Sequence, residues 1–313
     1  MKTFFTILVL TTLMACHKKD TPTTTLNFEE DLMPEGITID PQSKTLFLNS
    51  MKYNKIVASK LDGSEPGNFI ENNEYGYLSG FGMTIKGDTL YALGDSYSGN
   101  NNQSILLLLN VKTGDLVDSY TLQDTTFTLL NDLAISSNNE IFITETRNNK
   151  IYKIQRPNKV LEVYLDSEEI AHPNGISISE DNKYLYVASR TKGIRIIDIS
   201  SKKILNESNK DLGGVDGLKY YNNSLIGIVN AKRDVNEHGV FRYFLSKEGD
   251  SITHIEKIIP YGENFEVPTT LDIVDGHLYY ITQSQLLNYN YETKEVLDTT
   301  KLKPYVLMKK RIE

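Results

Sequence analysis

The 313-residue chain has no tryptophan, a single cysteine and almost none of the amphipathic pattern that predicts helices. One cysteine excludes a disulfide within the chain. The apolar run from Phe4 to Leu13 is too short to span a bilayer as a stable helix. No glycine-rich phosphate-binding loop is present either, because Gly80-Phe81-Gly82 lacks the strand-then-helix context that such a loop requires. These absences favour a fold built from strands and held together by packing.

Basic surface patterns are also lacking. The chain has 41 acidic residues against 33 lysines and arginines, and its net charge is −8. Nucleic-acid phosphates attract a basic surface, so this balance argues against nucleic acid as a partner. The short basic run Lys309-Lys310-Arg311 is expected to form a solvated tail.

The N-terminal 25 residues have the pattern of an export signal followed by a tether. Met1-Lys2 is positively charged, the apolar run follows it, and Leu13-Met14-Ala15-Cys16 resembles the lipobox of bacterial lipoproteins. The pattern predicts a signal peptide over residues 1–15 and a polar tether over residues 16–25 that begins at a lipidated Cys16. A plain signal peptide with an incidental cysteine is the alternative.

Lipidation would decide where the protein resides, since two acyl chains give durable membrane attachment. We therefore expect an exported protein that is anchored to a bacterial membrane through Cys16, with the outer membrane favoured. Its globular domain would lie in the periplasm or at the cell surface.

From residue 26 onward, short alternating strands are separated by Asn, Gly, Asp and Lys turns, which is typical of a propeller, sandwich or barrel. Internal repetition chooses between these folds, because one strand–turn–strand unit recurs six times at intervals of 42 to 53 residues. We call the residue just before the first strand of each unit its lead residue. The lead residues are Glu35, Phe81, Asn131, Asn174, Asp216 and Thr269.

The spacing predicts an all-β fold, a six-bladed β-propeller with four-stranded blades, over residues 26–313. Leu286 to Tyr289 is expected to form the third strand of the last blade. Ring closure is expected to use Leu26 to Phe28 beside the last blade, since a closed ring leaves no long unpaired edge. The pattern leaves open whether that stretch or Pro304 to Met308 supplies the outermost strand.

In a propeller the first strand of each blade lines the central channel, so the lead residues should form a ring at its mouth. Four of them offer oxygen ligands, namely Glu35, Asn131, Asn174 and Asp216. Two carboxylates that converge in a pore repel each other and are costly to desolvate, and a divalent cation relieves both effects. Oxygen ligands favour Ca²⁺, with Mg²⁺ and Mn²⁺ next, whereas Zn²⁺ prefers His or Cys. The alternative is structural, because Asn or Asp before Gly is also a turn signal.

Four motifs carry a resemblance to a known family: Pro34-Glu35-Gly36-Ile37, Leu130-Asn131-Asp132-Leu133, Pro173-Asn174-Gly175-Ile176 and Val215-Asp216-Gly217-Leu218. They resemble the metal-site motifs of the gluconolactonase/regucalcin (senescence marker protein) family, and the match spans about residues 30 to 295. The resemblance implies a six-bladed propeller whose central Ca²⁺-type ion is bound by the Glu, the two Asn and the Asp of these motifs. It also implies hydrolysis of lactones or related esters.

In such a site the ion would polarise a lactone carbonyl, and Asp216 would be the general base or the nucleophile. One position departs from the family pattern. Sugar-lactone members typically have an Arg two residues before the third-blade Asn, and this chain has Leu129 there. An aldonolactone substrate is therefore not favoured.

Ends of the second strands should also face the mouth and line a substrate pocket. The candidates for substrate binding are Arg147, Asn230 and Gln283, together with the lead residues Phe81 and Thr269. Arg147 would suit an acidic substrate, although it can instead be a surface residue that balances Glu145. His172 is a candidate proton shuttle, and the alternative is an ordinary loop residue.

Two functions follow from these patterns. The first is a metal-dependent hydrolase that acts on a small-molecule lactone or ester at the cell envelope. The second is a non-catalytic lipoprotein whose ion is structural and whose propeller face binds a ligand or a protein. The fold by itself does not choose between them.

Overall fold

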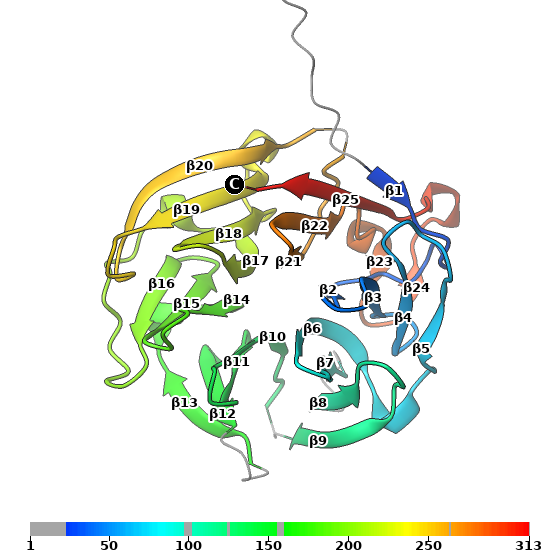
Figure 1. Ribbon diagram of the computed structural model, residues 1–313, viewed down its shortest axis with the longest axis horizontal. Helices are drawn as coiled ribbons and strands as arrows, with labels where there is room; N and C mark the ends of the chain where they lie inside the picture. Colours follow the sequence, from blue (N-terminus) through cyan, green and yellow to red (C-terminus); the bar gives the residue numbers. More distant parts are fainter. Residues whose placement is uncertain (1–22, 97–101, 124–125, 155–159, 263, 313) are drawn as a thin grey trace, which may run out of the picture.

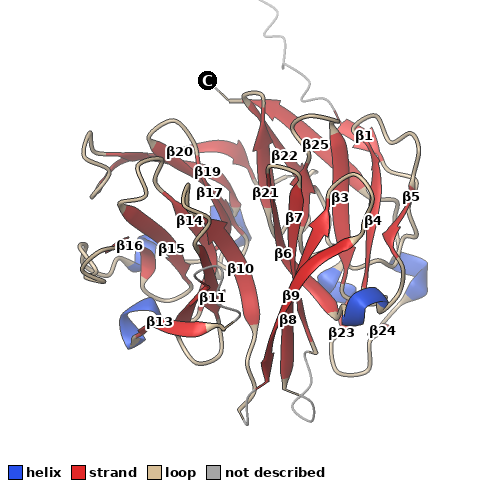
Figure 2. Ribbon diagram, turned by 60° about the horizontal axis from the view of Figure 1, so that its bottom comes forward, coloured by secondary structure: helices blue, strands red, loops and turns tan. Residues whose placement is uncertain are grey.

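The protein is described here from a computed structural model that covers residues 23–96, 102–123, 126–154, 160–262 and 264–312. Six antiparallel sheets stand around a central axis, as the ring of labels in Figure 1 shows, and a seventh sheet has only two strands. Helices in the described residues are all short 3-10 turns, and Figure 2 shows them only in the connections between strands. None of the described helices is long and apolar enough to cross a membrane. The fold is the predicted six-bladed β-propeller.

Each of the first three blades follows the chain order from the axis outward. Blade one contains β2 (Ile37–Ile39), β3 (Thr45–Ser50), β4 (Lys55–Lys60) and β5 (Gly67–Ile70). Blade two contains β6 (Ser79–Lys86), β7 (Thr89–Asp95), β8 (Gln103–Asn110) and β9 (Leu116–Gln123), after the turn η1 (Glu74–Gly76). Blade three contains β10 (Leu130–Ile135), β11 (Ile141–Glu145), β12 (Lys150–Ile154) and β13 (Glu162–Asp166).

Blades four and five continue the ring. Blade four contains β14 (Pro173–Ile178), β15 (Tyr184–Ser189) and β16 (Gly193–Asp198), after the turn η2 (Glu168–Ile170). The place of its fourth strand is marked by a single bridge between Ile197 and Ile204. Blade five contains β17 (Val215–Tyr220), β18 (Ser224–Val229), β19 (Gly239–Leu245) and β20 (Ile252–Pro260), with the turns η3 (Lys210–Leu212) and η4 (Val235–Glu237).

Both ends of the chain build the sixth blade. Its order is β21 (Leu271–Val274), β22 (His277–Ile281), β25 (Val306–Arg311) and β1 (Thr23–Thr25). The C-terminal segment therefore supplies the third strand and the N-terminal segment the outermost one, which closes the ring. Thr23–Thr25, predicted as the end of the tether, thus form the outermost strand in place of the predicted Leu26 to Phe28. Lys309-Lys310-Arg311 lies in a strand rather than in a solvated tail.

One strand prediction for this blade is wrong. Leu286 to Tyr289 belongs to an insertion between β22 and β25, which contains η5 (Leu286–Asn288), β23 (Tyr289–Asn290), β24 (Glu295–Val296) and η6 (Thr299–Lys301). Leu286 and Tyr289 join a hydrophobic cluster with Met33, Met51 and Phe81, so their apolar side chains cover part of blades one and two. The apolar pattern was therefore a packing signal for a loop, not for a strand.

Strands within a blade are buried on both faces because each blade packs between two others. In β8, Leu106 and Leu108 belong to one hydrophobic cluster, whereas Leu107 and Leu109 belong to another. Successive side chains of a strand point to opposite faces, so a continuous apolar run is what a strand between two neighbouring blades requires.

Glycine follows the lead residue in four blades, at positions where the neighbouring blade comes very close. A Cβ atom on Gly36 would lie 2.2 Å from the carbonyl oxygen of Phe81, and one on Gly175 would lie 2.3 Å from that of Asp216. Each of these inner strands therefore packs directly against the backbone of the next lead residue. The glycines of the motifs are thus explained by blade packing.

Gly175→Ala should destabilise the propeller, because the new methyl group would force β14 away from β17. We expect a loss of about 1–3 kcal/mol in the free energy of unfolding, measured by urea denaturation. Gly67→Ala is the matched control, since a Cβ atom there meets nothing within 4 Å. Equal stability of the two variants would contradict this account of the packing.

Candidate metal centre and substrate cavity

Lead residues in four blades lie in β-bulges. The pairing register shifts between Gly80 and Met83, and the same shift occurs around Asn131, Asn174 and Asp216. A bulge bends its strand and changes the direction of a side chain, and bulges are common beside functional sites. The repeated unit therefore contains a β-bulge that changes the direction of its lead side chain.

Hydrogen bonds to backbone carbonyl groups join the lead residues into a ring. The Thr269 hydroxyl donates to the carbonyl oxygen of Glu35 at 2.8 Å. Gly217 N donates to the carbonyl oxygen of Thr269 at 2.9 Å, and the Thr144 hydroxyl donates to that of Asn174 at 2.6 Å. Together with the close approaches of the glycines, these bonds connect the lead residues of neighbouring blades around the axis. Thr269 thus has a structural bond that closes the ring.

Asp216 is the best-connected of the predicted ligands. Asn230 Nδ2 donates to Asp216 Oδ2 at 2.5 Å and to the carbonyl oxygen of Pro268 at 2.8 Å. Burial raises the pKa of Asp216 to about 6, although hydrogen bonds from Asn230 and Asn174 and the positive charge of Arg190 act in the opposite direction. The two amides thus hold the carboxylate in place at the edge of blade five.

Glu35 in blade one is separated from Asp216 by blade six and feels its charge. Burial, followed by repulsion from Asp216 and Asp132, raises the pKa of Glu35 well above its usual value. Among the described residues, the Glu35 carboxylate and the Asn131 amide have no hydrogen bond or ion pair with the protein. Mutual repulsion and unengaged oxygens are what a site for a hard divalent cation presents. The residues present therefore fit such an ion.

Amide oxygens are needed to complete this donor set. In the part of the chain that the structure describes, no three His, Cys, Asp or Glu side chains gather into a metal-binding group. A site at the ring would combine two carboxylates, Glu35 and Asp216, with two amides, Asn131 and Asn174. Ca²⁺ accepts such mixed oxygen ligands and completes its coordination with water.

Beside the ring lies a cavity of about 480 Å³ between blades three, four and five. Asn174 and Asp216 form part of its wall, and the predicted Arg147 and Asn230 also line it. The remaining lining residues are Leu129, Thr146, His172, Arg190, Thr191, Val215 and Ala231. Two predicted ligands and two predicted pocket residues thus meet in one cavity.

Arg190 is a lining residue that the sequence analysis missed. It follows the end of β15 and donates its backbone N–H to the carbonyl oxygen of His172 at 3.2 Å. Asn230 has the same register position in blade five, where its N–H donates to the carbonyl oxygen of Gly214 at 3.2 Å. Applying the position of Asn230 to the fourth repeat identifies Arg190.

The predicted pocket residue Phe81 and the acidic residue Glu145 lie elsewhere. Phe81 is only 4 % exposed and packs in the hydrophobic cluster under the blade-six insertion. Glu145 accepts hydrogen bonds from the backbone N–H groups of Leu129, Arg147 and Asn148 at 2.7–2.9 Å, so its role is to shape the loop. Neither side chain lines the cavity beside the ring.

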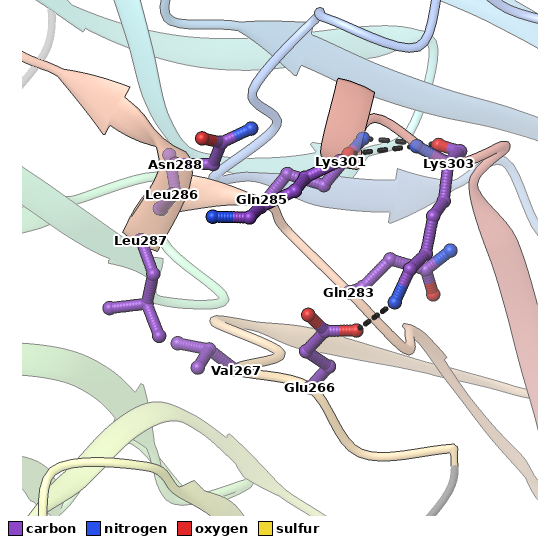
Figure 3. Close-up of a pocket in the computed structure, with 9 residues that line it drawn as sticks. All are labelled: Glu266, Val267, Gln283, Gln285, Leu286, Leu287, Asn288, Lys301 and Lys303. Atoms are coloured by element: carbon purple, nitrogen blue, oxygen red, sulfur yellow. Dashed lines mark hydrogen bonds and ion pairs between the residues drawn. The ribbon is translucent and has the colours of Figure 1, made fainter. Parts of the chain in front are cut away.

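Gln283 lines a second cavity of about 250 Å³, between the blade-six insertion and the segment before Pro268 (Figure 3). Its Nε2 donates to the carbonyl oxygen of Pro304 at 2.5 Å. Gln285 binds the backbone of Lys303 in both directions at 3.1 Å, and Lys303 forms an ion pair with Glu266 at 3.1 Å. This cavity contains none of the predicted ion ligands.

Comparison with known families agrees with the motifs. The model of the SMP-30/gluconolactonase/LRE-like region matches residues 23–219, which is more than half of the chain. The chain belongs to this family. The resemblance inferred from the motifs is therefore confirmed. By sequence alone, no curated protein matches the chain.

Solved structures with the same fold are distant in sequence. Regucalcin from Agrobacterium tumefaciens, a calcium-binding protein, has 16% identity and a TM-score of 0.56, with coverage of 91% of this chain and 90% of that one. Virginiamycin B lyase from Staphylococcus aureus has 19% identity and a TM-score of 0.58, with 93% and 88% covered. The PQQ-bound aldose sugar dehydrogenase from Streptomyces coelicolor has 11% identity and a TM-score of 0.63, with 92% and 96% covered. At these identities the likeness establishes the fold alone.

Asn174→Ala should weaken Ca²⁺ binding by roughly tenfold or more, because it removes one ligand of the ring. A bound ion stabilises the folded state, so the rise in melting temperature on adding Ca²⁺ should shrink in this variant. Ion content by mass spectrometry and thermal unfolding with and without Ca²⁺ measure both effects.

Asn68→Ala is the control for this experiment, since Asn68 is exposed on β5 and its side chain donates to Glu71 at 2.8 Å. Unchanged ion content and an unchanged thermal shift in Asn174→Ala would refute the ligand assignment.

Proposed function

We propose that this protein is a metal-dependent hydrolase of lactones or related esters, with a Ca²⁺-type ion at the propeller axis. The observation that carries the proposal is the position of Asp216, which belongs to the ring of lead residues and also lines the adjacent cavity. A substrate in this cavity would lie against both the ion site and a carboxylate. Membership of a family that includes gluconolactonases supports the same reaction class.

When bound, the ion supplies positive charge that polarises the substrate carbonyl and stabilises negative charge on its oxygen. Asp216 accepts a proton from the attacking water or attacks the carbonyl carbon itself. Asn230 keeps the Asp216 carboxylate oriented through its 2.5 Å hydrogen bond and is fixed in turn by Pro268. Loss of Asn230 would therefore act through the position of Asp216.

Leu129 narrows the substrate class. Leu129 lines the cavity, and sugar-lactone enzymes of the family typically have an arginine at this position. Val215 adds a second apolar group to the same wall. The cavity therefore suits a lactone or ester with an apolar body better than a polyhydroxylated sugar lactone.

Asp216→Asn should reduce hydrolysis by roughly 10²–10⁴-fold, because it removes the group that accepts a proton or attacks. The assay uses a panel of γ-, δ- and sugar lactones and simple esters, with saturating Ca²⁺ and after chelation. Asp88→Asn is the control, since Asp88 is an exposed turn residue paired with Lys112 at 3.3 Å.

A lack of turnover on every substrate, with the ion still bound to the wild-type protein, would exclude the hydrolase. It would favour the second function, a propeller whose ion is structural and whose face binds a ligand or a protein partner.

We also propose that the chain is exported and anchored to a bacterial membrane through a lipid on Cys16. The supporting pattern is the apolar run and the Leu13-Met14-Ala15-Cys16 motif, which lie outside the described residues together with the rest of residues 1–22. Cys16→Ser should move the protein from the membrane fraction to the soluble fraction and abolish incorporation of labelled palmitate. An unlabelled wild-type protein that is already in the soluble fraction would favour a plain signal peptide.

A further inference from the structure

Two arginines from neighbouring blades line the cavity beside the ring. Arg147 follows β11 in blade three and Arg190 follows β15 in blade four, and both side chains are exposed. Both residues line the same cavity as Asn174 and Asp216. In a chain with a net charge of −8, a pair of cations at this place calls for an explanation.

Each arginine is positioned by its loop. The backbone N–H of Arg147 donates to Glu145 Oε1 at 2.9 Å, and its guanidinium lies 4.8 Å from the centre of the Phe127 ring. Arg190 is fixed through its backbone, since its carbonyl oxygen accepts from Gly214 N at 3.4 Å. Its guanidinium forms no hydrogen bond or ion pair within the described ranges, and the residue lines the cavity.

Local acidic groups do not account for Arg190. A divalent cation would balance Glu35 and Asp216, and the Glu145 carboxylate is already bonded to three backbone N–H groups. Arg190 does reach Asp216 electrostatically, because its charge lowers the pKa of that carboxyl. With an ion bound, that interaction would not be needed to balance the site, and Arg190 would remain as positive charge beside the cavity.

We propose that the substrate carries an anionic group, a carboxylate or a phosphate, in addition to the bond that is cleaved, and that Arg190 and Arg147 bind it. A guanidinium group presents a planar fork of donors that matches either anion. Leu129 and Val215 would contact the apolar body of the same molecule. This inference rests on the proposed function, since it names the substrate class of that site.

Binding of non-hydrolysable probes tests the proposal without relying on turnover. Cyclopentanecarboxylate, cyclopentyl phosphate and the neutral cyclopentanecarboxamide are titrated by calorimetry into the Ca²⁺-loaded protein. We expect at least one anionic probe to bind roughly tenfold or more tightly than the carboxamide, as charge-assisted hydrogen bonds require. The stronger of the two anions identifies the group.

Arg190→Gln should abolish the preference for the anion, and Arg147→Gln should reduce it, with carboxamide binding unchanged in both. Arg233→Gln, an exposed arginine outside the cavity lining, controls for long-range charge and should bind like the wild type. Equal affinity for charged and neutral probes, no binding of either anion, or an equal loss in Arg233→Gln would overturn the inference.

Turnover assays separate this inference from the proposed function. Arg190-dependent anion binding without hydrolysis of any lactone would support the anion site and exclude the hydrolase. Hydrolysis of neutral lactones that is unaffected by Arg190→Gln, with no preference for acidic ones, would support the hydrolase and exclude the anion site.

Discussion

Six inner strands meet at the propeller axis so closely that a Cβ atom after most lead residues would overlap the neighbouring blade. Gly36 and Gly175 show the constraint directly, since added methyl groups would lie 2.2 and 2.3 Å from the next lead residue's carbonyl oxygen. The remaining architecture depends on this contact, because it sets the blade spacing and brings the lead residues into one ring. The polar side chains at those positions therefore come close together around the axis.

Bringing polar side chains together at the mouth of the ring has an electrostatic cost, and the two sides of the mouth differ in structure. Over blades one and two, the insertion of blade six buries Phe81 in an apolar cluster, so that side of the mouth is covered by packing. On the side of blades three to five the mouth stays open as a cavity, and Asp216 and Asn174 line it. The Glu35 and Asp216 carboxylates repel each other, and a bound cation would relieve this repulsion.

Repetition made much of the fold predictable. The lead-residue register at Asn131, Asn174 and Asp216 rests on a local pattern that each blade repeats, and the structure places the same β-bulge at each of them. The sixth blade was less predictable, because Val306–Arg311 and Thr23–Thr25 pair across almost the whole length of the chain. A local periodicity cannot predict such a pairing. The apolar residues of the insertion, such as Leu286, have the pattern of a strand and were therefore predicted as the third strand of this blade.

Site residues were predictable to the extent that they follow the repeat. Asn230 and Arg147 come from strand ends and line the cavity as expected, and Arg190 would have followed from the register of Asn230. Gln283 has the equivalent place in blade six, yet it lines a different cavity because the insertion there redirects the chain. An insertion is a feature of one blade only, so the pattern shared by the other five carries no information about it.

The central claim is that four lead residues bind one divalent cation at the axis. A crystal structure of the protein grown with Ca²⁺, with the ion identified by its anomalous scattering, tests this claim most directly. The account predicts one ion with side-chain oxygens of Glu35, Asn131, Asn174 and Asp216 at about 2.3–2.6 Å. A ring without an ion, in which the Glu35 and Asp216 carboxyl groups share a proton or bond only to water, would contradict it.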